Sequence, residues 1–254
     1  MRWGLEHGMQ VRRAGQGGRP GPRVVWIHGL GESSVSFEPV IEKLPGFDHV
    51  LVDLPGYGRS PWPDAPLGLT EVADRLARWL DDDRPAVIAG HSMGGVLCTL
   101  VAERTAVRAV IDIDGNLTRG DCTFSALASA YPEADFCARG FSEMRAQVYA
   151  DGQTRPELRT YHAAMCFASP AMFHRHAREL VELSSEGTLG PRLAALHVPA
   201  LFVAGVPSGI CADSRALLDR LGVRWLGIAP AGHWVYLDQL DRFAAEVTRF
   251  LTEL

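Results

Sequence analysis

The chain has few of the features that mark nucleic-acid binding, secretion or membrane insertion. Its 254 residues carry a formal net charge of -5. No block of basic residues is available to neutralise nucleic-acid phosphates. The sequence contains no apolar run long enough to span a bilayer, and its first residues lack the apolar core of a signal peptide. We therefore expect a cytoplasmic protein that binds neither nucleic acid nor membrane.

Residues that hold metals, disulfides or nucleotides are also scarce. The cysteines are odd in number and never spaced as Cys-x-x-Cys, which disfavours a disulfide framework and a zinc site; they are Cys98, Cys122, Cys137, Cys166 and Cys211. His174 and His176 have no third ligand nearby, so we interpret them as packing or surface residues. No Gly-x-x-x-x-Gly-Lys-Ser/Thr and no Gly-x-Gly-x-x-Gly follows a predicted strand. We expect neither a metal nor a cofactor.

The chain does contain short β-branched runs that alternate with longer amphipathic stretches, a pattern typical of a parallel sheet with helical crossovers. Core strands are predicted at 23–27, 49–53, 86–89, 109–113, 200–204 and 224–228, with an edge strand at 9–13. Helices are predicted at 36–44, 70–80, 93–105, 214–221 and 241–251, with Thr70 and Ser214 as N-caps. The fold class is α/β, with a mostly parallel, doubly wound sheet.

One interval breaks the alternation. Residues 116–196 contain several helical stretches but no convincing strand, and they are rich in aromatic residues and methionine. We predict a helical cap over 116–196, inserted between two core strands, and a core domain made of 1–115 and 197–254. Most cap aromatics are expected to pack with one another, while a few line an apolar pocket between cap and sheet.

A serine flanked by glycines stands between a predicted strand and a predicted helix. The stretch Gly90-His91-Ser92-Met93-Gly94 follows an apolar run and leads into another. A sharp turn in this position lifts the serine hydroxyl above the sheet, as nucleophilic serines require. Ser92 is therefore the predicted nucleophile.

A serine nucleophile needs a base, which in turn needs an acid to orient it. His233 follows the last predicted strand and precedes the C-terminal helix, so it is expected at the carboxyl edge of the sheet. His91 adjoins Ser92 but is expected to point elsewhere if the turn is sharp. His233 is the predicted base.

The oxyanion formed by serine attack needs hydrogen-bond donors that already point at it. His28-Gly29-Leu30-Gly31 directly follows the first core strand. The backbone amide of Leu30 could therefore converge with that of Met93 above the sheet. Leu30 and Met93 are the predicted oxyanion-hole residues.

Together these motifs resemble the α/β-hydrolase fold family, in its capped serine esterase form. The resemblance covers almost the whole chain and rests on four stretches: His28-Gly29-Leu30-Gly31, Asp53-Leu54-Pro55-Gly56-Tyr57-Gly58-Arg59-Ser60, Gly90-His91-Ser92-Met93-Gly94-Gly95 and Gly232-His233. In that family the second stretch, which begins with Asp53, has a structural role, so Asp53 is excluded as the catalytic acid. A serine nucleophile also separates the chain from the related haloalkane dehalogenases, which use aspartate.

The chain departs from the family pattern at the catalytic acid. Ser208 stands where the family places an aspartate after the strand that follows the cap. Either Asp213 reaches in from farther along, or the acid has moved to the end of the preceding strand, as in some lipases of this fold. Asp114 is the last residue before a glycine there, whereas Asp112 would lie inside the sheet. We favour Asp114; Asp213, or no acid at all, stays open.

The resemblance implies a hydrolase that forms an acyl-enzyme on Ser92. An ester or lactone of a small-to-medium apolar molecule is the expected substrate. The same groups would also serve a biosynthetic thioesterase, an acyl-transfer or cyclising enzyme, or a carbon–carbon bond hydrolase. A different class, a non-catalytic ligand-binding protein on the hydrolase fold, is disfavoured because both Ser92 and His233 are retained.

Overall fold

The computed structural model describes residues 2–15, 21–81 and 85–254. Its centre is an eight-stranded sheet with the order β1-β2-β4-β3-β5-β6-β7-β8. The strands are β1 (Arg2–Glu6), β2 (Met9–Ala14), β3 (Arg23–Ile27), β4 (Asp48–Asp53), β5 (Val87–His91), β6 (Ala109–Ile113), β7 (Ala200–Ser208) and β8 (Trp225–Gly232).

The expected mostly parallel, doubly wound sheet is confirmed. Strands β3 to β8 run parallel to one another, and β5 and β6 are buried along their whole length. Such strands are covered on both faces, which accounts for their continuous apolar sequences. From β3 the chain goes to β4 on one side and then to β5 on the other. This reversal leaves a crevice at the carboxyl ends of β3 and β5, the usual ligand position in open α/β sheets.

The strand expected at the sheet edge is not at the edge. β2 pairs antiparallel with β4 on one side and with β1 on the other, so β1 is the outer strand. A two-residue turn joins β1 to β2, and both His7 and Gly8 have positive φ, as tight hairpin turns require. The prediction failed because the first residues alternate apolar and polar over too short a stretch to be recognised as a strand.

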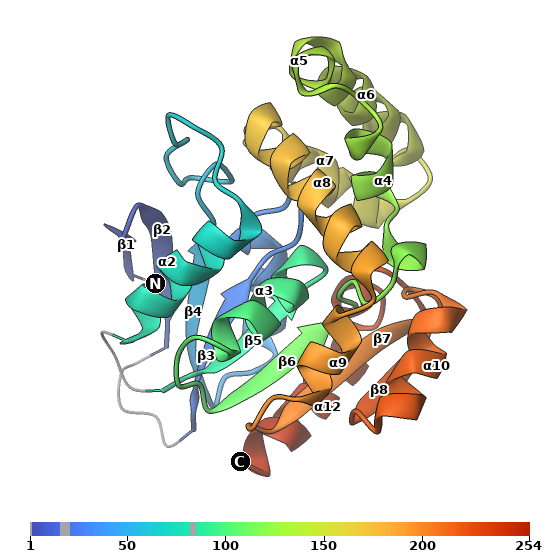
Figure 1. Ribbon diagram of the computed structural model, residues 1–254. Coiled ribbons are helices and arrows are strands. Elements are labelled where there is room, and N and C mark those ends of the chain that lie inside the picture. The colour runs from blue at the N-terminus through green and yellow to red at the C-terminus, as the bar shows by residue number, and fades with distance from the viewer. Residues whose placement is uncertain (1, 16–20, 82–84) are drawn as a thin grey trace.

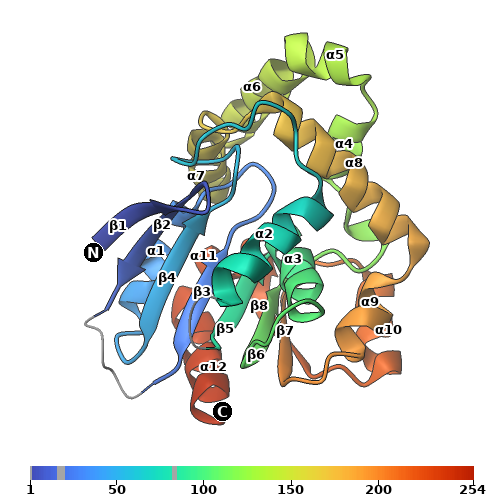
Figure 2. The same ribbon diagram turned by 60° about the vertical axis from the view of Figure 1, so that its left-hand side comes forward.

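Helices cover both faces of the sheet, and others lie over one of its ends. The α-helices of the described residues are α1 (Glu38–Glu42), α2 (Leu69–Asp81), α3 (Met93–Ala102), α4 (Phe124–Ser129), α5 (Glu133–Asp135), α6 (Phe141–Asp151), α7 (Pro156–Met165), α8 (Pro170–Glu186), α9 (Leu189–Ala194), α10 (Ala212–Leu221), α11 (Val235–Asp238) and α12 (Leu240–Thr252). Figures 1 and 2 show α2 and α3 on one face of the sheet and α12 on the other.

Both predicted N-caps are wrong. α2 begins one residue before Thr70, and the Gly68 amide donates to Glu71 at 2.7 Å, so a glutamate in the first turn satisfies the helix start. α10 begins at Ala212, which places Ser214 inside its first turn. The Ser214 hydroxyl donates instead to Asp121 at 2.6 Å, a contact between distant segments that local sequence patterns do not reveal.

Helices α4 to α8 lie between β6 and β7 in the chain and stack over one end of the sheet (Figures 1 and 2). Many of their aromatic rings contact one another, with Phe136 lying against Tyr131, Phe141 and Phe173. Helix α9 packs against α3 and α10. The exact division into a core of 1–115 with 197–254 and a cap of 116–196 stays a prediction.

His174 and His176, which the sequence suggests are packing or surface residues, lie in the protein interior. His174 Nε2 bonds the Tyr131 carbonyl at 2.9 Å, and His176 Nδ1 bonds the Tyr57 hydroxyl at 2.8 Å. In the described part of the chain, no three His, Cys, Asp or Glu residues gather as a metal site. None of the described helices combines the length and hydropathy needed to cross a membrane.

Candidate active site

Ser92 occupies a sharp turn between β5 and α3. Its φ of 53° and ψ of -118° are unusual for a residue with a side chain, and such strain often accompanies function. The flanking glycines are needed because a Cβ at position 90 would overlap the Gly94 carbonyl, and one at position 94 would overlap the Ile27 carbonyl. The close packing of α3 against β3 and β5 therefore fixes the turn and presents Ser92 at the crevice.

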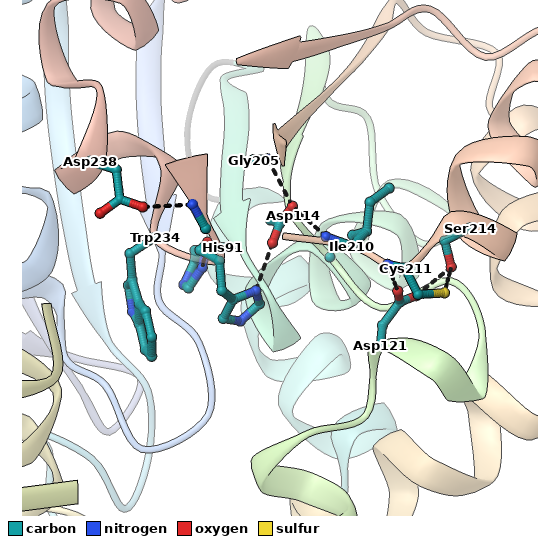
Figure 3. Close-up of polar contacts among 12 residues, drawn as sticks. His91, Asp114, Asp121, Gly205, Ile210, Cys211, Ser214, Trp234 and Asp238 are labelled. Carbon is teal, nitrogen blue, oxygen red and sulfur yellow. Dashed lines mark hydrogen bonds and ion pairs between the residues drawn. The ribbon is translucent and has the colours of Figure 1, made fainter. Parts of the chain in front are cut away.

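His233 and Asp114 are joined by a hydrogen bond of 2.7 Å from His233 Nδ1 to Asp114 Oδ2. Asp114 follows β6 directly and has a φ of 51°. Its other oxygen, Oδ1, accepts from the backbone amides of Gly205 and Ile210, both at 3.1 Å (Figure 3). The Asp114 side chain is fully buried, while that of His233 is 28% exposed. These bonds hold a carboxylate behind a histidine that still reaches the cavity.

The other candidate acids do not contact His233. Asp213 is exposed in the first turn of α10. Asp53 accepts the backbone amides of Ser34 and Arg59 and so holds two loops together. Asp112 is buried within β6 and accepts the Gly115 amide at 2.9 Å. Burial raises the pKa of Asp112 to about 8, because the Gly115 bond offsets only part of the desolvation.

The loop between β7 and α10 is held by two carboxylates. The amide of Ile210 donates to Asp114, and that of the next residue, Cys211, donates to Asp121 at 2.8 Å. Ser214 also donates to Asp121 (Figure 3). The loop in which the family places its acid therefore binds Asp114 through backbone amides.

A buried ion pair lies beneath the site. Glu32 is 1% exposed and accepts hydrogen bonds from the Gly29 amide and the Trp234 indole. His91 Nδ1 lies 3.0 Å from Glu32 Oε1, and His91 Nε2 lies 2.9 Å from the carbonyl oxygen of His233. The ring nitrogens of His91 thus face the Glu32 carboxyl group on one side and a carbonyl oxygen on the other. With Glu32 ionised, His91 donates from both nitrogens as an imidazolium.

The charges of this pair stabilise each other. Burial alone would raise the pKa of Glu32, but His91, the Gly29 amide and Trp234 outweigh it and lower that pKa to about 2. Burial alone would lower the pKa of His91, but the adjacent Glu32 carboxylate raises it above the ordinary value. The pair connects the segment after β3 to the loop that carries His233.

Sequence reasoning did not find this pair. Fifty-nine positions separate Glu32 from His91. The His91 side chain contacts Glu32 and the His233 carbonyl, in agreement with the expectation that it points away from Ser92, and its ring lies 4.6 Å from the ring of His233, centroid to centroid. A glutamate within an otherwise apolar and glycine-rich segment was the one available signal.

The predicted oxyanion donors lie at the carboxyl ends of adjacent strands. Leu30 follows β3, and Met93 is the first residue of α3, where an amide has no acceptor within its own helix. Among the described residues, no backbone acceptor pairs with the Leu30 amide. Gly31 has a φ of 74°, and a Cβ there would meet the ring of Phe173. The turn that directs Leu30 toward the crevice therefore requires glycine.

Ser92 and His233 line the same small cavity, of about 30 Å³, between the sheet and the cap. No hydrogen bond joins the Ser92 hydroxyl to the His233 ring in the described structure; catalytic bonds of this kind often tighten only when substrate binds. Two of the cap aromatics, Phe124 and Tyr161, line the cavity as expected, together with the polar residues Asn116, Asp121, Thr123 and Ser125.

Comparison with known sequences agrees with the motifs. The profile of the alpha/beta hydrolase family matches residues 24–246. A pimeloyl-[acyl-carrier protein] methyl ester esterase of Stenotrophomonas maltophilia (strain R551-3) is 30% identical over 92% of this chain and 94% of its own. A 2-succinyl-6-hydroxy-2,4-cyclohexadiene-1-carboxylate synthase of Serratia proteamaculans (strain 568) is 26% identical over 93% of this chain and 95% of its own.

Comparison with solved structures supports the same fold. An enol-lactonase from Burkholderia xenovorans LB400 superposes with a TM-score of 0.78 and 19% identity, over 99% of this chain and 100% of its own. An esterase from Exiguobacterium antarcticum superposes with a TM-score of 0.75 and 19% identity, over 96% and 95%. At this identity the likeness concerns the fold alone.

Proposed function

The chain belongs to the alpha/beta hydrolase family and is a serine hydrolase of esters or lactones, and we propose that Ser92, His233 and Asp114 perform its chemistry. The observation that carries the proposal is the 2.7 Å bond between His233 and Asp114, made beside the cavity that Ser92 also lines. The roles of these three residues follow from their geometry and chemistry, since the fold by itself does not define them.

In the first half of the reaction, Ser92 Oγ attacks the substrate carbonyl while His233 Nε2 takes its proton. Asp114 holds Nδ1 of His233 and stabilises the charge that the ring acquires. The Leu30 and Met93 amides donate to the oxyanion of the tetrahedral intermediate. His233 then gives the proton to the leaving alcohol, and the acyl group stays on Ser92.

In the second half, water replaces the alcohol. His233 takes a proton from water, whose oxygen attacks the acyl carbonyl, and the proton returns to Ser92 as the acid leaves. The buried Glu32–His91 pair holds the His233 carbonyl in place through His91 Nε2. We also propose that the protein is cytoplasmic and binds neither nucleic acid nor membrane. This proposal rests on the charge and hydropathy of the sequence.

The first test uses a fluorophosphonate probe, which labels activated serines. Wild type should be labelled, whereas Ser92→Ala should not, and His233→Ala should be labelled far more slowly. Equal labelling of wild type and Ser92→Ala would refute the proposal. A panel of methyl esters, acyl thioesters and lactones would then separate ester hydrolysis from the thioesterase alternative by comparing kcat/KM.

A further inference from the structure

Two neutral polar side chains in the Ser92 cavity have hydrogen-bonding atoms with no partner. Asn116 is 4% exposed and Ser125 is 5% exposed, and both line the cavity. In the described structure the Asn116 amide has one weak contact, from Nδ2 to Cys122 Sγ at 3.8 Å, and its Oδ1 accepts nothing. The Ser125 hydroxyl makes no hydrogen bond with the described residues either. Neither residue is among those with a sealed, unpartnered side-chain atom, so both side chains offer unused hydrogen-bonding capacity to whatever occupies the cavity.

The order of the strands in the sheet determines where Asn116 and Ser125 lie relative to Ser92. Strand β5 lies between β3 and β6, so the oxyanion segment with Leu30 is on one side of Ser92. Asn116 follows β6 and is therefore on the other side, and Ser125 comes from α4 of the cap. A group bound by Asn116 and Ser125 would thus be separate from the carbonyl oxygen that Leu30 and Met93 hold.

The charge of the cavity defines the kind of group that fits. Neither lysine nor arginine is among the described residues that line it. Two carboxylates line the cavity, Glu32 and Asp121, and both already accept hydrogen bonds from the protein. The donors to Glu32 are His91, the Gly29 amide and Trp234. The donors to Asp121 are the amides of Leu117, Thr118 and Cys211 and the Ser214 hydroxyl. The His91 cation is already paired with Glu32, so an anionic substrate group would find no free cation among the described lining residues, whereas a neutral hydroxyl can both donate and accept.

We propose that Asn116 and Ser125 form a polar subsite for a hydroxyl group carried close to the scissile carbonyl, so that the substrate is a small hydroxylated ester or lactone. The proposal rests on the hydrolase function given above and specifies its substrate class. The cavity beside Ser92 is small, about 30 Å³, and a compact substituent such as a hydroxyl suits it better than a bulky one. A site built to bond a hydroxyl discriminates strongly against analogues that lack it, since its own polar groups are then left unpaired.

The test compares ester pairs that differ by one hydroxyl. The pairs are methyl 3-hydroxybutyrate with methyl butyrate, methyl lactate with methyl propionate, and 2-hydroxyethyl butyrate with ethyl butyrate. For wild type, kcat/KM should favour the hydroxylated member of at least one pair by about tenfold or more. The pair that shows the preference tells whether the hydroxyl belongs to the acyl or the alcohol part.

The variants Asn116→Leu and Ser125→Ala should bring that ratio close to one, whatever they do to each rate alone. Ser129→Ala is the matched control, because Ser129 lies on the same helix, does not line the cavity and donates to the Ala126 carbonyl. It should keep the wild-type ratio. Thermal unfolding of each variant verifies that it is folded.

Ratios near one for every pair in wild type would overturn the subsite while leaving the hydrolase function intact. The same holds if the two cavity variants keep the wild-type ratio. If Ser92→Ala releases acid as fast as wild type, the proposed function fails and the subsite fails with it. A substrate preference that depends on Asn116 and Ser125 supports both.

Discussion

Gly209 lies directly against the carboxylate of Asp114. A Cβ at position 209 would be 2.8 Å from Asp114 Oδ2 and 2.5 Å from the Gly205 carbonyl oxygen, closer than real side chains approach such atoms. Gly205 is equally restricted, because a Cβ there would overlap the Gly232 carbonyl. The two glycines let the loop after β7 close over an acid that comes from β6. The position of the acid and the composition of this loop are therefore linked.

Gly209→Ala should lower kcat by about a hundredfold, the cost typical of moving a catalytic group by about 1 Å. The added methyl group must displace Asp114, and with it the orientation of His233, although position 209 does not line the cavity. Gly46→Ala is the control, since no atom lies within 4 Å of a Cβ there. Steady-state kinetics on a methyl ester measure the effect; unchanged kcat in a folded Gly209→Ala would contradict the role given to Asp114.

Asp114→Asn should lower kcat by about 10³- to 10⁴-fold, because the amide cannot stabilise the His233 imidazolium and favours the wrong ring tautomer. Asp213→Asn should behave like wild type, since Asp213 is exposed and makes no contact with His233. Comparing kcat for the two variants decides between the acids that the sequence left open. A large loss in Asp213→Asn with little in Asp114→Asn would reverse the assignment.

The fold could be predicted because its signals are local. Buried parallel strands are continuous apolar runs, and the Ser92 turn needs glycines at 90 and 94 that stand next to it in the sequence. Because position 208 is a serine and not the aspartate usual in the family, the sequence limits the candidate acids to Asp114 and Asp213. The position of Asp114 at a strand end favours it as the acid, although the sequence does not show the loop whose amides bind it.

The other features depend on contacts between distant segments. Nothing near Glu32 in the sequence indicates that His91 lies against it, and nothing near Asn116 indicates that Ser125 from the cap joins it in one cavity. Ser214 resembled an N-cap because its partner, Asp121, is 93 residues away. Such relationships follow from how the cap packs on the sheet, which hydropathy patterns do not specify.

Asp112→Asn should make the stability of the protein less dependent on pH. With a folded pKa of about 8 against an ordinary 3.8, Asp112 binds more protons in the native state than in the unfolded state across this interval. The contribution of Asp112 to the free energy of unfolding therefore falls as pH rises from about 4 to about 8. Asparagine can still accept a hydrogen bond from the Gly115 amide but cannot ionise. The stability of the variant relative to wild type should therefore increase as pH rises.

Urea unfolding of both proteins at pH 5 and pH 8 measures this effect. The difference in unfolding free energy between Asp112→Asn and wild type should shift in favour of the variant at pH 8. A difference that stays constant over this interval would mean that Asp112 is ionised in the folded protein at neutral pH.

Glu32→Gln should destabilise the protein by about 3–5 kcal/mol at pH 7, the usual cost of leaving one member of a buried ion pair without its partner. Glutamine keeps the shape and can still accept from the Gly29 amide, but it cannot balance the charge on His91. The buried ring must then lose its charge, and the Trp234 indole, which donates to Glu32 in wild type, would face the new amide nitrogen instead of an acceptor. Because Trp234 adjoins His233, kcat should fall as well, with KM less affected.

The pH dependence separates this effect from a loss of packing. Glu32 has a folded pKa of about 2 against an ordinary 4.5, so its contribution is fully present above pH 4.5 and is lost as pH falls toward 2. The stability gap between wild type and Glu32→Gln, measured by urea unfolding at pH 3, 5 and 7, should therefore narrow at pH 3. Glu182→Gln removes an exposed helical ion pair with Arg178 and should cost under about 1 kcal/mol at each pH. A gap for Glu32→Gln that is equally wide at pH 3 and pH 7 would mean that shape, and not charge, accounts for the stabilisation by Glu32.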